Sequence, residues 1–440
     1  MSADGFSSSL WAATAIAAPE CATLQGPHES ETVVIGGGFC GLSAALHLAE
    51  AGRTVTVLEA REPGWGASGR NGGQVVNGLN AGLDDIVRRY GSKTGAFFGS
   101  LLQEGAGIIY RLVDQYGIEC DLKHGNVYAA YTTRHMRGLE AKQALWRQHG
   151  MDDHELLDRE AIRRHVGSDL YAGGMMDRSG GHMHPLNLAL GEARAFESLG
   201  GRIYELSPVT GIERPARRTA ERSGDGAGGA TVVRTSAGAV TAKTVVLCGN
   251  AYLGRAVPEL AARVMPVSTQ MIATEPLGSE RAASLLPTDM CLEDSRYILD
   301  YFRLSADHRL IFGGGVVYGG TGPADVVAKI RPNMEKVFPS LRGIGIDYAW
   351  SGNFALSFTR VPQLGRLGDG VYFAHGYSGH GVTGSHLFGR ILAEAIDGDL
   401  SRFDVFAGLP WVPFPGGRLL RAPYSTLGSW WYALRDRLGL

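Results

Sequence analysis

The hydrophobic pattern near the start of the chain predicts a strand, a helix and a second strand in close succession. Apolar residues run from Val33 to Ile35 and from Val55 to Leu58, and between them apolar positions recur at helical spacing from Leu42 to Ala49. Later patterns predict strands at 244–247, 265–274, 301–304, 309–313 and 371–374, and helices at 184–199 and 387–396. Strands that alternate with helices are typical of an α/β fold.

Glycine gives the first of these elements a chemical meaning. The chain has 63 glycines among 440 residues, and twelve of them fall within residues 36–82. Gly36, Gly38 and Gly41 form a GxGxxG turn directly after the first strand, and Glu59 ends the second strand. This is the complete βαβ unit that holds a dinucleotide: the diphosphate rests on the helix N-terminus and the acid accepts hydrogen bonds from ribose hydroxyls.

The loop after Glu59 distinguishes FAD from NAD. Residues 60–74 contain many small side chains, which would let main chain lie against a flat ring system, and an ordinary NAD-dependent dehydrogenase needs no such loop here. Its polar side chains can offer hydrogen bonds to a diphosphate or to the ring heteroatoms. The residues predicted to bind the cofactor in this loop are Ala60, Arg61, Ser68, Arg70, Asn71, Gly72, Gly73 and Gln74.

A second glycine-rich turn lies about 300 residues further along the chain. Strand 371–374 runs into HGYSGHGV (375–382), and an amphipathic helix follows. The unpaired N–H groups of that helix N-terminus would stabilise negative charge at the N1–C2=O edge of a reduced flavin. Gly379, Gly381 and Val382 are therefore predicted to bind the cofactor, and His380 to touch the cofactor or the substrate.

Charge and cysteine content limit the other function classes. A net charge of −2 excludes nucleic acid as the main partner, and five widely spaced cysteines suggest neither a disulfide framework nor a metal site. No apolar run reaches 18 residues, so we expect a cytoplasmic protein without stable membrane insertion. Residues 401–440 predict a tail that packs on the body or on a partner subunit, which would permit an oligomer, or else a membrane-surface helix. The glycine-rich segment 223–229 predicts a hairpin loop, and the glycines of 313–322 have no assigned function.

At several places the chain resembles the FAD-dependent amine and amino acid oxidase superfamily that includes D-amino acid oxidase, glycine oxidase and sarcosine oxidase. Within it the residues are most similar to the γ-glutamylputrescine oxidoreductase group. The similarity rests on SLWAATA (9–15), the block 33–59, WGASGRNGGQ (65–74), RVPQLGR (360–366) and GYSGHG (376–381).

The resemblance implies a discontinuous architecture. An FAD-binding Rossmann-like domain of the glutathione-reductase type would be interleaved with an α+β substrate domain built on a mixed sheet. The implied ranges are 1–29 for an N-terminal extension, 30–85, 160–260 and 345–400 for the FAD domain, 86–159 and 261–344 for the substrate domain, and 401–440 for the tail. The backbone at Val209 would meet the adenine.

The resemblance also implies the reaction. A neutral amine would pass hydride from its α-carbon to flavin N5, the imine would be hydrolysed, and O2 would be reduced to H2O2 unless another carrier takes the electrons. The FAD would be non-covalent, because the cysteine and histidine that bind flavin covalently in relatives have no counterpart at 353–358 or near Trp65.

Substrate choice is approached through the carboxylate clamps of the superfamily. The clamp arginine of glycine oxidase would fall within WSGNFAL (350–356), which has none, and the lysine and arginine of sarcosine oxidase fall at Thr383 and Gly73. These departures favour an amine of the γ-glutamylputrescine type. Arg303 could form a different clamp, which would instead favour a secondary amino acid of the iminodiacetate, sarcosine or pipecolate type.

Other candidates and other classes stay open at this point. Tyr252, Tyr301, Trp350 and Tyr377 are predicted to build walls around the amine. The candidate catalytic residues are His380, Arg303, Tyr252 and Trp350. An NAD-dependent dehydrogenase and a non-catalytic flavoprotein are the alternatives from other classes.

Overall fold

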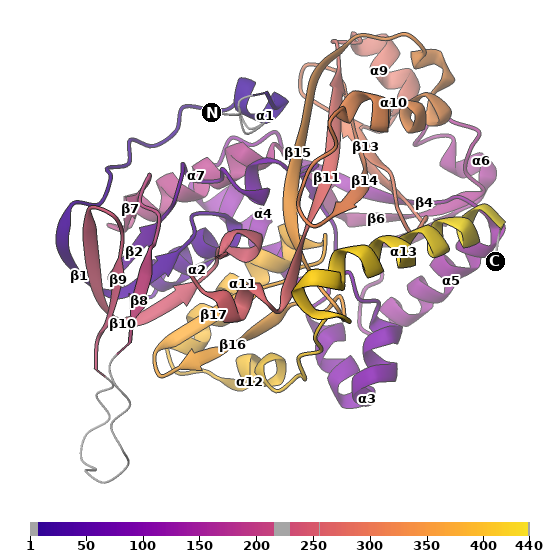
Figure 1. The fold of residues 1–440 in the computed structure, drawn as a ribbon. Coiled ribbons are helices and arrows are strands. Elements are labelled where there is room, and N and C mark those ends of the chain that lie inside the picture. The colour runs from indigo at the N-terminus through magenta and orange to yellow at the C-terminus, as the bar shows by residue number, and fades with distance from the viewer. Residues whose placement is uncertain (1–7, 215–228, 255, 439–440) are drawn as a thin grey trace.

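The computed structural model describes residues 8–214, 229–254 and 256–438 (Figure 1). The strands form two sheets that lie side by side, and helices cover both. This arrangement confirms the predicted α/β fold with a mixed second sheet. The predicted hairpin loop at 223–229 lies almost entirely outside the described residues, but the strands that flank it, β8 (Gly211–Glu213) and β9 (Thr231–Arg234), do pair antiparallel.

The first sheet has eight strands and contains the predicted βαβ unit. Its main order is β16-β17-β10-β1-β2-β7, in which β17, β10, β1, β2 and β7 run parallel. The strands are β1 (Gly26–Ile35), β2 (Val55–Leu58), β7 (Arg202–Tyr204), β8 (Gly211–Glu213), β9 (Thr231–Arg234), β10 (Gly238–Leu247), β16 (Gln363–Gly368) and β17 (Val371–His375). Parallel strands are covered on both faces, which explains the continuous apolar runs of β1 and β2.

Three packed helices support the first sheet. They are α2 (Phe39–Glu50), α7 (Pro185–Ser198) and α11 (Gly381–Ile396), and α2 contacts both of the others. The helix predicted at 387–396 corresponds to α11, which begins six residues earlier, at Gly381. Because parallel strands end at the same edge, the N-termini of α2 and α11 both come to the carboxyl edge of the sheet.

The second sheet has nine strands, and its main order is β15-β11-β14-β13-β12-β4-β6-β3. Only the β12–β4 pair is parallel among the strand pairs described in it. The strands are β3 (Gln74–Val75), β4 (Lys123–Ala130), β5 (His154–Leu157), β6 (Gly173–His182), β11 (Val264–Thr274), β12 (Cys291–Asp294), β13 (Tyr301–Leu304), β14 (Leu310–Tyr318) and β15 (Ile346–Ser357). The helices beside it are α3 (Leu83–Ser100), α5 (Thr133–Arg147), α6 (Arg159–Ile162), α9 (Ser279–Leu285) and α10 (Val326–Val337), whereas α4 (Glu104–Tyr116) packs on α7 and α11 of the first sheet.

The points at which the chain passes from one sheet to the other differ from the predicted domain boundaries. Strand β6 lies within 160–260 and β15 within 345–400, both predicted for the FAD domain, yet both are strands of the second sheet. We call the part of the chain that forms the first sheet and its helices the first unit. We propose that the chain returns to this unit after β6, near residue 183, and again after β15, near residue 358. The difference arises because strand pairing over long sequence distances leaves no local pattern.

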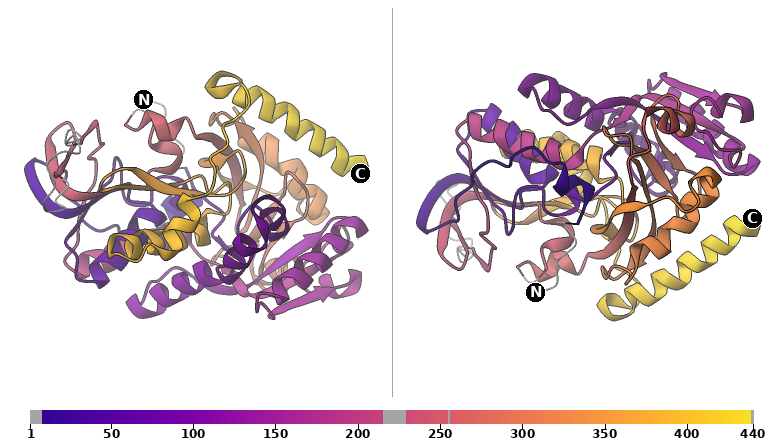
Figure 2. Two further views of the ribbon diagram at one scale, coloured as in Figure 1. Left: turned by 90° about the horizontal axis from the view of Figure 1, so that it is seen from below. Right: turned by 90° about the horizontal axis from the view of Figure 1, so that it is seen from above.

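The N-terminal extension and the C-terminal tail both pack on the body. Trp11 in α1 (Leu10–Ala13) is 1% exposed, and its ring packs edge-on against Trp350. In the tail, α12 (Ser401–Ala407) packs on β16, and Arg421 of α13 (Gly417–Leu438) donates to two carbonyls near the start of β11. Helix α13 lies on the outside of the molecule in both views of Figure 2. No described helix is long and apolar enough to cross a membrane.

Candidate functional site

A cavity of about 680 Å³ lies between the two sheets. Small-molecule and cofactor sites usually enclose about 300–1,000 Å³. One wall comes from the first unit and includes the β1–α2 turn, the loop after β2, η2 (Asn250–Tyr252) and the N-terminus of α11; the other comes from β11, β12, β13, β14 and β15. The predicted residues that line it are Gly36, Gly38, Glu59, Ala60, Arg61, Ser68, Arg70, Asn71, Gly72, Gln74, Val209, Tyr252, Gly379, His380, Gly381 and Val382.

The β1–α2 turn is built for close approach of a ligand. A Cβ on Gly41 would lie 1.9 Å from the carbonyl oxygen of Gly36, so this position seals the turn against the helix and does not itself line the cavity. Gly36 has a φ of +109°, which favours glycine. The Ser68 hydroxyl accepts a hydrogen bond from the Phe39 N–H at 2.9 Å and so fixes the first turn of α2.

Glu59 lines the cavity beside the β1–α2 turn. Its carboxylate accepts hydrogen bonds from the N–H of Gly37 at 2.6 Å and of Arg61 at 2.9 Å. Burial raises the pKa of Glu59. Each carboxylate oxygen has more than one acceptor site, so Glu59 can still accept from a ribose hydroxyl. Val209 lies on the same cavity wall, as expected for an adenine contact.

In the loop 65–74, the polar side chains mainly hold the loop itself. The Asn71 amide donates to the carbonyls of Ala67 and Ser68 and accepts from the Gly73 N–H. The Gln74 amide donates to the Leu292 carbonyl at 2.9 Å, which ties the loop to the second sheet. The loop therefore offers the cavity mostly main chain, with its side chains as internal supports.

Arg70 holds the loop 65–74 in place through contacts of its guanidinium with Trp65. Its Nε donates to the Trp65 carbonyl at 2.9 Å, and its guanidinium lies 4.4 Å from the centre of the Trp65 ring. With 4% of its surface exposed, Arg70 is buried at the edge of the cavity. A cation held there would favour an anionic cofactor group.

The N-terminus of α11 is held in place by two buried contacts. Thr383 donates its hydroxyl to the Val76 carbonyl at 2.7 Å, and the His386 ring lies 2.6 Å from a Glu192 carboxylate oxygen. Gly381 and Val382 in the first turn of α11 line the cavity, and the N–H groups of a first helical turn have no partner within the helix. Burial and the charge of Lys142 lower the pKa of His380 to about 4, so its imidazole is neutral at pH 7.

The contacts of Arg303 contradict its predicted role as a carboxylate clamp. Arg303 is 3% exposed and does not line the cavity. Its guanidinium donates to the carbonyls of Gly72, Met183 and Leu304, and contacts the His182 ring at 3.0 Å. Arg303 thus lies beneath the loop 65–74, which is called the flavin loop below because it is the segment predicted to contact the flavin ring. Gly73 is also outside the cavity, because a Cβ there would lie 2.0 Å from the Met183 carbonyl and 2.8 Å from Arg303.

Trp350 also lies outside the cavity, against the prediction that it forms a wall around the substrate. It is 1% exposed, and its Nε1 donates to the Arg70 carbonyl at 2.9 Å. Tyr252 does line the cavity, 5.5 Å from the Trp65 ring centre. The side chain of Trp350 points beneath the loop because strand residues alternate between the two faces of a sheet.

We expect Trp350→Phe to lower the free energy of unfolding of the holoprotein by about 1–3 kcal/mol, because it leaves the buried Arg70 carbonyl without its donor. The KM for an amine should stay within twofold of the wild type. Urea unfolding and steady-state kinetics measure the two quantities. A changed KM with unchanged stability would instead place Trp350 at the substrate.

Tyr301 and Tyr377, which the sequence analysis placed in the walls around the amine, do line the cavity. Glu293 and Arg360 also line it and were not identified from the sequence; burial raises the pKa of Glu293 to about 7. A strand carboxylate is a weak signal by itself, but Glu293 stands next to Tyr301 across β12 and β13. The pairing of Glu293 with Tyr301 exists only in the folded sheet, so it leaves no signal in the sequence. Arg360 belongs to the RVPQLGR segment, whose position beside the cavity also depends on the fold.

The glycines at 313–322 now have a structural reason. A Cβ on Gly313 would lie 2.3 Å from the Tyr301 ring, so the missing side chain makes room for that ring. Gly314 and Gly315 line the cavity directly. The cluster therefore shapes the second wall of the site.

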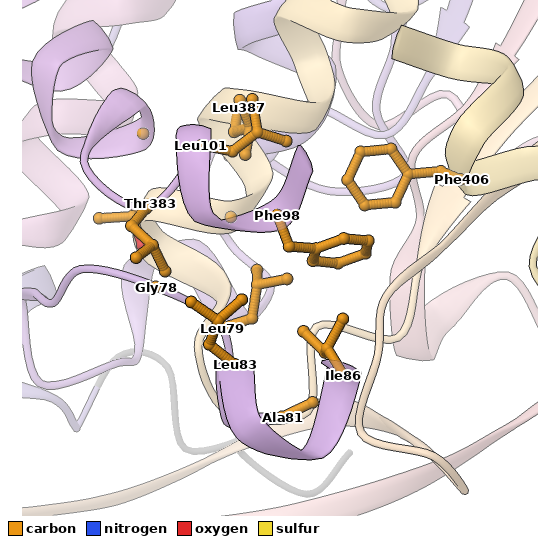
Figure 3. A pocket seen from close by; sticks show the side chains of 13 residues that line it. Gly78, Leu79, Ala81, Leu83, Ile86, Phe98, Leu101, Thr383, Leu387 and Phe406 are labelled. Atoms are coloured by element: carbon orange, nitrogen blue, oxygen red, sulfur yellow. The ribbon is translucent and has the colours of Figure 1, made fainter. Parts of the chain in front are cut away.

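A second, much smaller pocket lies between α3, α4, α11 and α12 (Figure 3). Its volume of about 20 Å³ has room for roughly one water molecule. Apolar side chains such as Phe98, Leu387 and Phe406 form its walls, and the Thr383 hydroxyl is already bonded to Val76. It carries no chemistry of its own. No cluster of three or more metal-ligating side chains occurs in the described part of the chain.

The comparison with protein families decides between the dinucleotides. Residues 31–395 match the family model DAO, FAD dependent oxidoreductase. The chain belongs to the DAO family. The cofactor of this family is FAD, so the alternative of an NAD-dependent dehydrogenase is set aside.

Relatives within the DAO family extend over nearly the whole chain. Gamma-glutamylputrescine oxidoreductase of Escherichia coli is 50% identical over 98% of this chain and 99% of its own length. Probable oxidoreductase OrdL of Haemophilus influenzae is 39% identical over 93% and 92%. Among solved structures, L-proline dehydrogenase from P. horikoshii superposes with a TM-score of 0.69 at 20% identity, covering 84% of this chain and 94% of its own. The chain is thus an FAD-dependent oxidoreductase.

Proposed function

We propose that this DAO-family enzyme oxidises the C–N bond of an amine of the γ-glutamylputrescine type. One observation carries the proposal: beside the loop 65–74 the second wall presents a carboxylate and a tyrosine, Arg303 is turned away beneath that loop, and the lining arginine Arg360 lies beside the exposed Tyr297. An α-amino acid oxidase needs a cation near the reacting carbon for the substrate carboxylate. The similarity to gamma-glutamylputrescine oxidoreductase supports the same substrate class.

Several segments would hold the FAD non-covalently. The diphosphate would rest at Gly36, Gly38 and the N-terminus of α2, with the ribose at Glu59 and the adenine at Val209. The ring would lie between the loop 65–74 and the turn 379–382. Two helix N-termini at one cavity suit an anionic cofactor with a diphosphate and a ring that gains negative charge.

The bound FAD would supply the hydride acceptor that turns the amine into an imine, which water then hydrolyses to an aldehyde and an ammonium ion. The protein would orient the amine and limit the access of water. Tyr252 and Tyr301 line the cavity for that purpose. The neutral His380 has one ring nitrogen that can accept a hydrogen bond from the amine.

The proposed electron acceptor is O2 and the proposed location is the cytoplasm. All five cysteines are free thiols, as expected for a protein in a reducing compartment. Release of H2O2 in stoichiometric amounts with the aldehyde would support O2 as acceptor. Turnover only with an added carrier would instead indicate a dehydrogenase.

A substrate panel tests the proposed function. Holoenzyme is assayed aerobically for aldehyde and peroxide with γ-glutamylputrescine, putrescine, glycine, sarcosine and pipecolate. We expect kcat/KM for γ-glutamylputrescine to exceed that for each amino acid at least a hundredfold. A preference for sarcosine or pipecolate would contradict the proposal in favour of a secondary amino acid oxidase, and activity with none of the five would contradict it in favour of a non-catalytic flavoprotein.

A further inference from the structure

We propose that the cavity has two subsites of opposite charge: Glu293 binds the amine end of the substrate near the flavin, and Arg360 binds a carboxylate at the cavity mouth. The substrate class that fits is an amine whose carboxylate lies many bonds away from the reacting carbon. This inference rests on the proposed amine oxidation and adds the orientation of the substrate.

Glu293 is the acidic side chain on the sheet wall of the cavity. Its carboxylate accepts no hydrogen bond and forms no ion pair with any residue that the structure describes, although the charge of Lys142 acts on it electrostatically. The neighbouring Asp294 gives the contrast: it points to the other face of the sheet, where Arg296 donates to it at 2.9 Å. A carboxylate removed from water is costly unless a cation compensates it. Glu293 therefore lacks a hydrogen-bond donor, which the amine group of a substrate can supply.

Lys142 does not fill that role, because its ammonium is held elsewhere. It lies 3.7 Å from the centre of the Tyr128 ring and 4.4 Å from that of Trp146. Such cation–π contacts hold a charge in place at close range. Lys142 thus stabilises the ionised Glu293 from a distance and leaves its oxygens open toward the cavity.

Arg360 is the complementary group. It follows β15, lines the cavity, and donates from one terminal nitrogen to the Tyr297 hydroxyl at 3.0 Å. Within the described residues it has no carboxylate partner. A guanidinium has five N–H donors in a planar fork that matches a carboxylate, and Arg360 retains donors for such a ligand.

The order of the two subsites follows from their neighbours. Tyr301, which pairs with Glu293 across the sheet, reaches the flavin loop, because a Cβ on Gly72 would lie 2.8 Å from its ring. Tyr297, the partner of Arg360, is 41% exposed. Negative charge thus lies on the flavin side and positive charge toward solvent. In an α-amino acid both charges sit on one carbon, so it cannot reach both subsites, whereas an acylated diamine with a distal carboxylate can.

Two synthetic amines separate the subsites. N-glutarylputrescine carries the distal carboxylate, and N-pentanoylputrescine has the same chain length without it. For the wild-type holoenzyme we expect a KM at least tenfold lower for the glutaryl compound. Arg360→Met should raise the KM for the glutaryl compound at least tenfold and that for the pentanoyl compound less than twofold, while Glu293→Gln should raise both by the same factor of at least ten.

Matched controls are Arg137→Met and Glu140→Gln, two exposed positions on α5 outside the cavity; both should keep wild-type KM values. FAD content and circular dichroism establish that each variant is folded. If Arg360→Met does not fold, the wild-type ratio of the two KM values and the variant Arg360→Lys decide. Equal KM values for the two amines in the wild type would contradict the proposal of two subsites. Equal effects of Arg360→Met on the two KM values would contradict it as well. Oxidation of neither amine by the wild type would instead refute the proposed function itself.

Discussion

Replacing Gly38 by alanine should lower the affinity for FAD at least a hundredfold while leaving the fold intact. The backbone at Gly38 is extended, with a φ of −93°, a conformation that alanine adopts freely. The added methyl group would lie in the cavity, 2.8 Å from the Ser68 hydroxyl, where a diphosphate has to approach the main chain. A hundredfold loss corresponds to about 3 kcal/mol, the size expected when hydrogen bonds to a charged group are lost.

The measurement is FAD affinity by fluorescence titration of the apoprotein, beside thermal unfolding of the same sample. Gly107→Ala is the matched control, because a Cβ there meets nothing within 4 Å and the position lies in α4, outside the cavity. It should bind FAD like the wild type. Unchanged FAD affinity in Gly38→Ala would contradict the placement of the diphosphate at the β1–α2 turn.

Arg303→Met should lower the free energy of unfolding by about 3 kcal/mol and affect acidic and neutral amines alike. The substitution leaves the carbonyls of Gly72, Met183 and Leu304 without their donor, and each buried orphan costs about 1–3 kcal/mol. Relief of burying a charge, which already lowers the pKa of Arg303 to about 10, offsets part of this cost.

Urea unfolding of the holoprotein measures the stability, and KM values for N-glutarylputrescine and N-pentanoylputrescine measure selectivity. Arg137→Met again serves as the control for loss of an arginine. We expect the two KM values to change by the same factor. Unchanged stability with a KM that rises only for the acidic amine would restore Arg303 as a carboxylate clamp.

The cofactor half of the site could be predicted from the sequence because its signals are local. Gly36, Gly38, Gly41 and Glu59 lie within one βαβ unit, and their spacing is set by a turn, a helix and a strand. The second glycine turn is likewise a strand followed by a helix N-terminus. Such elements keep their geometry wherever the rest of the chain goes.

The substrate half could be predicted only in part, because tertiary packing decides the rest. Tyr301 and Arg303 are two residues apart on β13 and share one face of the sheet, yet Tyr301 lines the cavity and Arg303 lies under the loop 65–74, which comes more than two hundred residues earlier in the chain. Glu293 faces the cavity and Asp294 the opposite face, although they are neighbours in the chain. The face of β12 that meets the cavity depends in part on its pairing with β4, more than a hundred residues earlier, and a single sequence does not encode that pairing in a local pattern.

Anaerobic reduction of the holoenzyme shows whether the bound FAD takes electrons from an amine whose carboxylate is remote from the reacting carbon. One equivalent of N-glutarylputrescine is mixed with the oxidised protein without O2, and the flavin absorbance near 450 nm is followed in a stopped-flow instrument. We expect the amine to bleach the flavin absorbance fully in one turnover and to release one equivalent of aldehyde. Glycine should cause no bleaching on the same timescale. A flavin spectrum that the amine leaves unchanged, or that glycine bleaches equally fast, would contradict the proposed function.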